Sequence, residues 1–547
     1  MKKLFILLFL LMIAGSQLSC QKNIRAFDKL MSSLFIEDGP GGVAIVVKDG
    51  TVLYRKAFGM ADLELDVAMS PDNVFRIGSI TKQFTACAIL KLAEEGKLDL
   101  QDDITSFLGD YPTHGYHISI EHLLTHTSGI KSYTDMEDWT SEFRKKDFAP
   151  PELVDFFKNQ PMDFAPGEEF RYNNSAYFLL GYIVELVSGM SYADYVDSTF
   201  FTPLGMKNSY YGSTSRIIPR RASGYAREGE VYKNADFLSM TQPHGAGALI
   251  ATVDDLYTWY SAVMHGKVIS EESLNKATTS YILNSGKKTG YGYGWFLGNI
   301  QGSPSISHGG GINGYLTASM YLPEEDVFVA VFSNCTCNAP ERTALKMAAI
   351  SIGKPYEWDS ISLDAELLKS YEGVYSSEFD GDMFMTFRDG KIFVMRSGGM
   401  ETALTPFEKD KFFVKDGTST FHFQRSEDME ITAVISKGTG YDILWNRTDK
   451  SLPVHEAIEL DASVLEQYIG EYELGPEFIL KIFQEGALMF AQATGQDKIE
   501  IFPVEMDVFY VRGMDVKLVF NRGEDGSIES LTLHQNGEHL AKRIGGI

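Results

Sequence analysis

One stretch of the chain is apolar around the whole circumference of a helix. Within residues 75–96, apolar side chains follow Lys82 with hardly a polar break. A helix that is apolar on every side is typical of the interior of a domain. The pattern therefore predicts a single buried helix over residues 75–96, with Ser79 in its first turn.

Alternating patterns predict strands before and after this helix. Val43–Val47 and Val52–Lys56 are joined at Asp49-Gly50, which is a strong hairpin signal. Two longer strands are predicted at 316–321 and 327–333. A sheet therefore precedes the buried helix, and more strands follow it.

The last third of the chain repeats itself. Leu368–Tyr375 recurs 97 residues later as Leu465–Tyr472, and Pro406 matches Pro503 at the same offset. Each copy holds alternating strands that turn at an Asp-Gly or Glu-Gly pair. Two small antiparallel β-barrels are predicted, since closure removes exposed strand edges. Two sandwich modules are the alternative.

The chain opens with the pattern of a secretion signal. Met1–Lys3 is basic, Leu4–Ala14 is an apolar run of eleven residues, and Ser16–Cys20 is small and polar. Cys20 stands where bacterial lipoproteins are cleaved and acylated, although Gln17 is a poor match to that motif. We expect an exported lipoprotein with a lipid on Cys20, with simple cleavage to a soluble exported protein as the alternative.

Composition and charge narrow the class of protein. The 547 residues are 44% apolar and 22% charged, as in ordinary globular chains of two to four domains. The net charge is -25 and no basic run is interleaved with aromatics, which argues against nucleic acid as a partner. Cys335 and Cys337 stand too close in sequence for an easy disulfide.

Ser79 and Lys82 are a candidate nucleophile and base. Residues three apart lie on one face of a helix, so the Lys82 amine can reach the Ser79 hydroxyl. Desolvation and the positive end of the helix dipole both lower the pKa of such a lysine. The same spacing occurs at Ser128/Lys131, however, so the pair alone is weak evidence.

A histidine cluster and a tyrosine motif follow the helix. His122-Leu-Leu-Thr-His126 lacks the glutamate of a His-Glu-x-x-His zinc site, so we expect these histidines to fix a turn through hydrogen bonds. Tyr172-Asn-Asn174 lies at the entrance of an amphipathic helix, where the asparagines are also consistent with a simple helix cap.

A glycine run forms the last motif. His308-Gly-Gly-Gly311 leads into the strand pair at 316–333, where glycines allow close approach of a substrate and leave amides free as donors. Lys288-Thr-Gly290 leads into no such pair. A lipase is excluded because no Gly-x-Ser-x-Gly follows the glycine run.

In this order, these motifs resemble those of the serine beta-lactamase-like superfamily, and most of all its class C, D-aminopeptidase and esterase branch. The resemblance covers roughly residues 40–353. It implies an α/β (α+β) catalytic domain with a central antiparallel sheet and a helical subdomain, with the active site between them.

The resemblance also implies roles for individual residues. Ser79 would be the acylated nucleophile, Lys82 its amine partner and Tyr172 a second proton-shuttling group. Residues expected to bind substrate are Asn174, His308, Gly310 and Gly311, with the amides of Ser79 and Gly311 forming the oxyanion hole. Neither a metal nor an organic cofactor is required by this mechanism.

The predicted domains follow the chain in order. They are a signal peptide (1–19), a tether (20–39), the hydrolase domain (40–353), a linker (354–365), barrel repeat 1 (366–449), a second linker (450–462) and barrel repeat 2 (463–547).

His308 stands where beta-lactamases of this branch commonly carry lysine, whereas peptidase and esterase members often carry histidine. The expected function is an exported serine hydrolase of small peptides, amides or esters, including those with D-residues or from the cell wall. A beta-lactamase is the first alternative. A penicillin-recognising sensor or binding lipoprotein is the second, and a catalytically dead scaffold is the third. Localisation in the bacterial cell envelope, on the periplasmic or outer-surface side, is expected, and the oligomeric state is left open.

Overall fold

The protein is described by a computed structural model that covers residues 21–547, except 398, 439, 441, 453–456, 476–477, 487, 536, 546 and 547. The predicted signal peptide and Cys20 lie outside the described residues. The chain divides into two compact units, of which the first holds the residues up to Tyr356 and the second nearly all residues from Glu357 onward.

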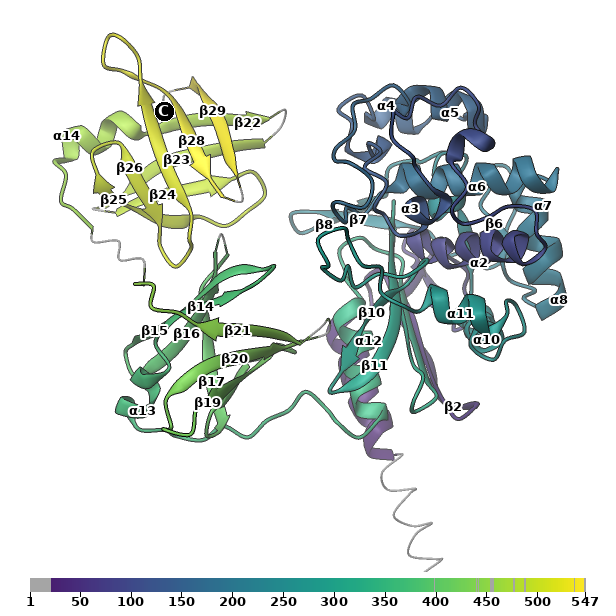
Figure 1. Ribbon diagram of the computed structural model, residues 1–547, viewed down its shortest axis with the longest axis horizontal. Coiled ribbons are helices and arrows are strands. Elements are labelled where there is room, and N and C mark those ends of the chain that lie inside the picture. Colours follow the sequence, from purple (N-terminus) through teal and green to yellow (C-terminus); the bar gives the residue numbers. More distant parts are fainter. Residues whose placement is uncertain are drawn as a thin grey trace, which may run out of the picture. The chain divides into compact units, whose positions relative to one another are not determined.

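A six-stranded antiparallel sheet forms the centre of the first unit (Figure 1). Its strands, in spatial order, are β10 (Phe296–Ile300), β11 (Ser303–Ile312), β12 (Tyr315–Leu322), β13 (Val327–Ser333), β1 (Gly42–Lys48) and β2 (Thr51–Phe58). The predicted hairpin is confirmed as β1 and β2, and the predicted long strands as β12 and β13.

Apolar side chains cover both faces of this sheet. All seven residues of β13 are buried, as expected for a strand with a layer on each side. One face packs on α12 (Glu341–Ser351) and on a helix that runs through residues 21–34. The predicted tether is therefore wrong for its described part, because Phe27 and Met31, four residues apart, are fully buried on this face.

The other face packs on the helical part of the unit. The helix predicted over 75–96 is observed as a short strand, a turn of 3-10 helix and a 14-residue α-helix, namely β5 (Phe75–Arg76), η1 (Gly78–Ile80) and α2 (Thr81–Glu94). Every residue of α2 from Thr81 to Leu90 is buried, which confirms the predicted central helix.

The remaining elements of the first unit complete this helical part and its connections. The helices are η2 (Ile104–Ser106), α3 (Ile120–Leu124), η3 (Tyr133–Asp135), α4 (Ser141–Arg144), α5 (Pro150–Phe157), α6 (Asn174–Ser188), α7 (Tyr192–Val196), η4 (Asp197–Phe201), α8 (Thr202–Leu204), α9 (His244–Gly247), α10 (Val253–Met264) and α11 (Glu271–Ala277). The short strands are β3 (Met60–Asp62), β4 (Val67–Ala68), β6 (Tyr210–Tyr211), β7 (Tyr225–Glu228), β8 (Val231–Asn234) and β9 (Leu249–Ala251). Within the described ranges, no single helix is long and apolar enough to span a membrane, and one bent pair (Asn174–Ser188 with Tyr192–Leu204) passes that test only when its two helices are joined.

The second unit holds two closed antiparallel barrels of eight strands each, which confirms the barrel prediction. The first barrel follows α13 (Ala365–Ser370) and consists of β14 (Gly373–Ser377), β15 (Gly381–Arg388), β16 (Lys391–Arg396), β17 (Thr402–Glu408), β18 (Lys411–Val414), β19 (Thr420–Arg425), β20 (Ile431–Lys437) and β21 (Ile443–Arg447). The second follows α14 (Ala462–Leu465) and η5 (Glu466–Tyr468), and consists of β22 (Gly470–Gly475), β23 (Phe478–Glu485), β24 (Leu488–Ala493), β25 (Ile499–Glu505), β26 (Val508–Val511), β27 (Lys517–Arg522), β28 (Ile528–His534) and β29 (Glu538–Gly545).

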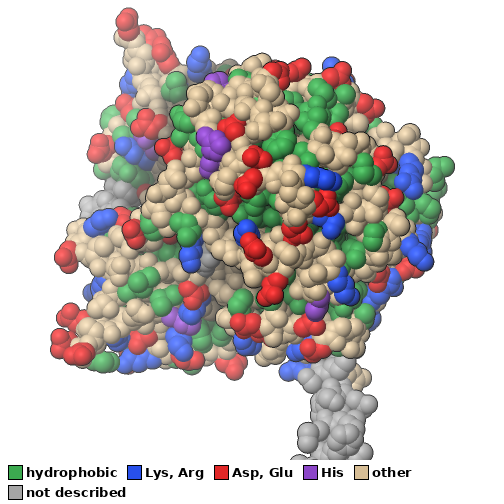
Figure 2. Space-filling view, turned by 45° about the vertical axis from the view of Figure 1, so that its right-hand side comes forward, with side chains coloured by type: hydrophobic (Ala, Val, Ile, Leu, Met, Phe, Trp, Pro, Cys, Tyr) green, Lys and Arg blue, Asp and Glu red, His purple; other side chains and the backbone are tan. Residues whose placement is uncertain are grey.

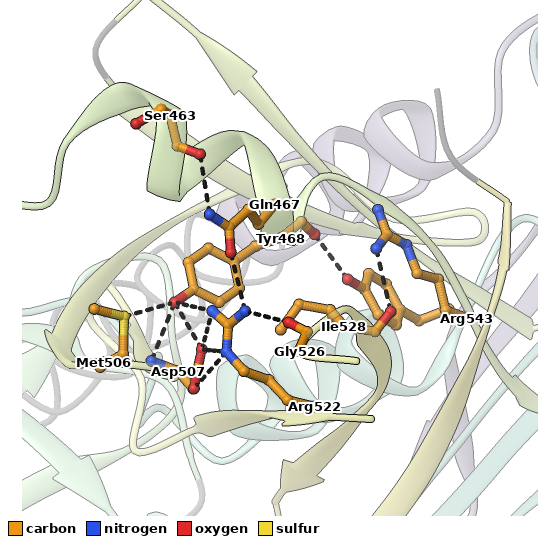
Figure 3. A network of polar contacts seen from close by, with 10 residues as sticks. Ser463, Gln467, Tyr468, Met506, Asp507, Arg522, Gly526, Ile528 and Arg543 are labelled. Carbon is orange, nitrogen blue, oxygen red and sulfur yellow. Dashed lines mark hydrogen bonds and ion pairs between the residues drawn. The ribbon is translucent and has the colours of Figure 1, made fainter. Parts of the chain in front are cut away.

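The sequence repeat corresponds to a polar network that occurs in both barrels. Figure 3 shows the copy in the second barrel. In the second barrel, the Tyr468 hydroxyl donates to Asp507 over 2.8 Å, and Arg522 donates to the same carboxylate over 2.7 Å. Tyr371, Asp410 and Arg425 make the same contacts in the first barrel. Buried aromatic and aliphatic side chains fill both barrel interiors.

Two smaller observations bear on the earlier expectations. Cys335 and Cys337 form a disulfide, contrary to prediction, because the chain bends after β13 and brings their Cα atoms to 5.1 Å, inside the usual range.

Acidic and basic side chains are interspersed on the face drawn in Figure 2, where no basic patch gathers.

Candidate active site

Ser79 lies in η1, immediately before α2, and is partly exposed. The preceding Gly78 adopts a φ of +52°, which a residue with a side chain rarely adopts. A Cβ at Gly78 would also lie only 3.0 Å from the amide nitrogen of Gly311. Glycine therefore allows the Ser79 turn to approach β11 closely.

Lys82 is fully buried beneath Ser79. Its Nζ lies 3.1 Å from Ser79 Oγ, 2.9 Å from Asn174 Oδ1 and 2.9 Å from the carbonyl oxygen of Ala246. None of these partners carries a charge, and burial holds the pKa of Lys82 well below its usual value. A neutral amine fits this arrangement, with two N–H groups donated to the carbonyl-type oxygens and a lone pair facing the Ser79 hydroxyl.

Tyr172 covers the other side of the amine. Lys82 Nζ lies 4.6 Å from the centroid of the Tyr172 ring. The Tyr172 hydroxyl is buried and makes no hydrogen bond within normal geometry, although Ser79 is close enough to oppose the shift in its pKa. Burial raises the pKa of Tyr172 above its usual value, so the phenol is protonated at neutral pH.

The two asparagines after Tyr172 have separate tasks. Asn173 is the N-cap of α6 and accepts a hydrogen bond from the Ala176 amide over 2.9 Å, so the helix-cap reading holds for this residue. Asn174 points into the site, where it accepts from Lys82 and donates through Nδ2 to Thr134 Oγ1 over 3.1 Å. Its contact with Lys82 was not anticipated from sequence.

His308 lies on β11 and is almost fully buried. Its Nδ1 is 2.6 Å from the carbonyl oxygen of Gly309, and its Nε2 is 3.1 Å from the hydroxyl of Tyr291. Burial lowers the pKa of His308 to about 3, so the ring is neutral at physiological pH. The partner Tyr291 was missed, although its Tyr-Gly-Tyr-Gly-Trp motif was noticeable in the sequence.

The glycines after His308 let β11 pack directly on the Ser79 turn. A Cβ at Gly310 would lie 2.0 Å from the carbonyl oxygen of Ile77, and the Thr317 hydroxyl donates to that same oxygen over 3.0 Å. This packing brings the Gly311 amide beside the turn that carries Ser79. The arrangement suits a pair of amide donors for a developing oxyanion.

A cleft opens beside these groups along β10 and β11. Ser79, Tyr172 and His308 all line it. Thr289 and Gly290 of the dismissed Lys-Thr-Gly triplet also line it, although they lie in a loop before β10 and not on a strand. His308, by contrast, lies on a strand of the sheet, β11.

The histidines predicted to fix a turn do so. His122 Nδ1 accepts from the Ser119 amide over 3.2 Å, which completes a capping box at the start of α3. His126 Nδ1 accepts from the Asn173 amide over 3.0 Å, which ties this turn to the Tyr172 segment.

Comparison with known proteins identifies the family of the chain. The family model described as Beta-lactamase matches residues 23–354. The chain belongs to the beta-lactamase family. The match covers the first unit and leaves the two barrels outside.

Several members of this fold are similar to the chain. Penicillin-binding protein 4* of Bacillus subtilis (strain 168) is 28% identical over 417 residues, which cover 71% of this chain and 90% of that protein. The structure of an octameric penicillin-binding protein homologue from Pyrococcus abyssi has a TM-score of 0.54 and 28% identity, and covers 78% of this chain and 99% of its own. A D-stereospecific amidohydrolase from Streptomyces sp. has a TM-score of 0.53 and 25% identity, and covers 59% of this chain and 98% of its own. Together with the family match, these similarities make the protein a serine hydrolase.

Proposed function

We propose that the protein is an exported hydrolase that forms an acyl-enzyme on Ser79 and releases the acyl group to water. The observation that carries the proposal is the uncharged environment of Lys82, whose Nζ lies 3.1 Å from Ser79 Oγ. A neutral amine at hydrogen-bond distance is a general base for a serine hydroxyl.

The acylation step follows from these positions. Ser79 Oγ attacks the substrate carbonyl carbon while Lys82 takes the hydroxyl proton. The negative charge that develops on the carbonyl oxygen is stabilised by the amides of Ser79 and Gly311. Such a donor contributes about 3 to 4 kcal/mol to the stability of the transition state.

The leaving group needs a proton when the C–N or C–O bond breaks. Tyr172 is protonated at neutral pH because burial raises its pKa, and its ring covers Lys82. We assign Tyr172 as the donor to the leaving group, with Lys82 returning the proton to Tyr172. In deacylation, water takes the place of the leaving group and the same proton path runs in reverse.

The proposed substrates are small peptides, amides and esters, including those with D-residues and those derived from the cell wall. Similarity to a D-stereospecific amidohydrolase supports this class. Asn174 is proposed to orient the amide on the acyl side of the substrate. Its Nδ2 carries two N–H groups, of which one donates to Thr134 and the other would donate to the substrate.

A second candidate is acylation by penicillins, as a beta-lactamase or a penicillin-recognising sensor. Similarity to penicillin-binding proteins favours it. Steady turnover of nitrocefin would identify the former, and stable acylation without turnover the latter.

The proposed location is the bacterial cell envelope, with a lipid on Cys20. The support is the basic start, the apolar run and the cysteine at the expected cleavage point. Mass spectrometry of the N-terminal peptide from a bacterial host tests this. A diacylglyceryl mass on Cys20 is expected, and an unmodified new N-terminus would contradict it.

The experiment that tests the function compares turnover of D- and L-alanine p-nitroanilides, p-nitrophenyl acetate and butyrate, and nitrocefin by residues 21–547. Ser79→Ala is the control. Loss of D-anilide turnover in Ser79→Ala is the expected result. Equal turnover by wild type and Ser79→Ala would contradict the assignment of Ser79.

A further inference from the structure

Both ring nitrogens of His308 are occupied. The carbonyl oxygen of Gly309 can only accept, so the proton must lie on Nδ1, which is 2.6 Å away. Nε2 then has a lone pair and accepts from the Tyr291 hydroxyl over 3.1 Å. In this tautomer, His308 has no N–H left for a ligand.

A second proton on the ring is also disfavoured. Burial lowers the pKa of His308 to about 3. Tyr291 stays protonated, because burial raises its pKa well above the usual value. The hydrogen bond therefore persists across the physiological pH range, and His308 brings no positive charge to the cleft.

The rest of the cleft does not supply that charge. None of the described residues that line it is lysine or arginine, and the charged side chain among them is that of Glu341, at the start of α12. A carboxylate that leaves water for such a site loses hydration without gaining a positively charged partner. A neutral group meets no such cost, and an ammonium has the Glu341 carboxylate as a partner of opposite charge.

Aromatic packing and a hydrogen-bonded turn fix the position of Tyr291. It is fully buried, and its ring centroid lies 4.8 Å from that of His126 and 4.7 Å from that of Phe296. The Leu297 amide donates to the carbonyl oxygen of Gly290 over 2.8 Å, which anchors the turn that carries Tyr291 against β10.

We propose that the Tyr291–His308 hydrogen bond makes the cleft select substrates that have no carboxylate beside the scissile bond. Tyr291 is a positioning residue that acts through His308. The inference rests on the proposed function, since it concerns substrates of the Ser79 site. It narrows their class to neutral esters and amides, and to those whose nearby charge is an ammonium.

The test uses two substrates that differ only in one charge, 3-acetoxybenzoate and its methyl ester. Each kcat/KM is divided by the rate constant of hydroxide hydrolysis, so that intrinsic reactivity cancels. Wild type is compared with Tyr291→Phe, His308→Lys and the control Tyr293→Phe, which removes another buried hydroxyl from the same motif, one that donates to Glu121.

Wild type should prefer the methyl ester by roughly tenfold or more. Tyr291→Phe leaves Nε2 free to take a proton beside a bound anion. The preference for the methyl ester should therefore fall by about threefold or more. The fall should be larger at about pH 5.5 than at about pH 8. His308→Lys should favour the acid, and Tyr293→Phe should keep the wild-type preference. No preference in wild type, or equal losses on both substrates in Tyr291→Phe, would overturn the proposal.

Nitrogen-15 NMR of labelled histidine separates this inference from the proposed function. His308, identified by its absence in His308→Gln, should show the Nδ1–H tautomer from about pH 5.5 to about pH 8, and the signal of Nε2 should change in Tyr291→Phe. If no substrate is turned over, the proposed function fails and the tautomer decides the inference. An imidazolium or an Nε2–H tautomer in wild type would overturn it.

Discussion

At the scale of single residues, burial has opposite effects on the protonation of Lys82 and Tyr172. Lys82 loses its proton because its charged form cannot be hydrated, and Tyr172 keeps its proton for the same reason. A base and an acid are thereby placed around one serine without any carboxylate among the partners of Lys82. Burial lowers the pKa of Lys82 from its usual 10.5 and raises that of Tyr172 from its usual 10.0, so the order of the two pKa values is the reverse of that in water.

The pH dependence of turnover tests the state of Lys82. A general base must be unprotonated, so kcat/KM should rise with pH through the pKa of Lys82 in the free enzyme and then reach a plateau. Because burial puts that pKa well below 10.5, the plateau should begin well below that pH. A rate that keeps rising until about pH 10.5 would contradict a neutral Lys82. Lys82→Met should lower kcat/KM by about 10²- to 10⁴-fold across this range.

Tyr172→Phe should separate amides from activated esters. An amine leaving group needs a proton and a p-nitrophenolate does not, so kcat/KM for an anilide of alanine should fall by about 10²- to 10⁴-fold while that for p-nitrophenyl acetate falls far less. Steady-state kinetics on the two substrates checks this. Equal losses on both would mean that Tyr172 acts elsewhere in the cycle.

At the scale of elements, the site is a contact between one strand and one turn. β11 carries His308 and the glycines, and it meets η1 because Gly310 has no side chain. Gly310→Ala should push β11 and η1 apart and lower the free energy of unfolding by about 1–3 kcal/mol. It should also lower kcat by about 10²-fold or more, because an oxyanion donor is displaced. Thermal unfolding and kinetics measure both.

Gly309→Ala is the matched control for stability. A Cβ there would lie 3.5 Å from the carbonyl oxygen of Thr317, which is ordinary van der Waals contact. Its melting temperature should stay close to that of wild type. An equal loss in the two variants would show that strand flexibility, rather than contact with η1, makes Gly310 necessary.

The elements also show what sequence patterns can and cannot predict. The buried helix, the β1–β2 hairpin and the barrels were predicted because each depends on local periodicity or on a repeat. The helix through residues 21–34 was missed, since its apolar stripe directly follows the predicted signal peptide and was interpreted as a tether. Tyr291 was missed as a site residue, because its partner His308 is 17 residues away and only the fold brings them together.

At the scale of the whole molecule, the candidate catalytic side chains all come from the first compact unit. Its long continuous segment ends at Tyr356 and contains Ser79, Lys82, Tyr172, Asn174 and His308. Residues 21–356 should therefore fold and react with a fluorophosphonate probe at Ser79. A folded truncation that does not react would show that the second unit is needed for chemistry.

The second unit should depend on its repeated polar networks for stability. Asp507→Asn removes the carboxylate that joins Tyr468 and Arg522 (Figure 3), and it should cost the second barrel about 1–3 kcal/mol. Scanning calorimetry should show a lower transition for this barrel while ester turnover persists. Asp410→Asn is the matched change in the first barrel. If neither variant lowers the transition temperature of its barrel, the networks do not contribute to barrel stability.

The central claim is that Ser79 becomes acylated. The most direct measurement is acid quenching during turnover of p-nitrophenyl butyrate, followed by mass spectrometry of the peptide that contains Ser79. The account predicts a butyryl group on Ser79 in wild type and none in Ser79→Ala. A butyryl group on another residue, or turnover without any acylated peptide, would contradict it.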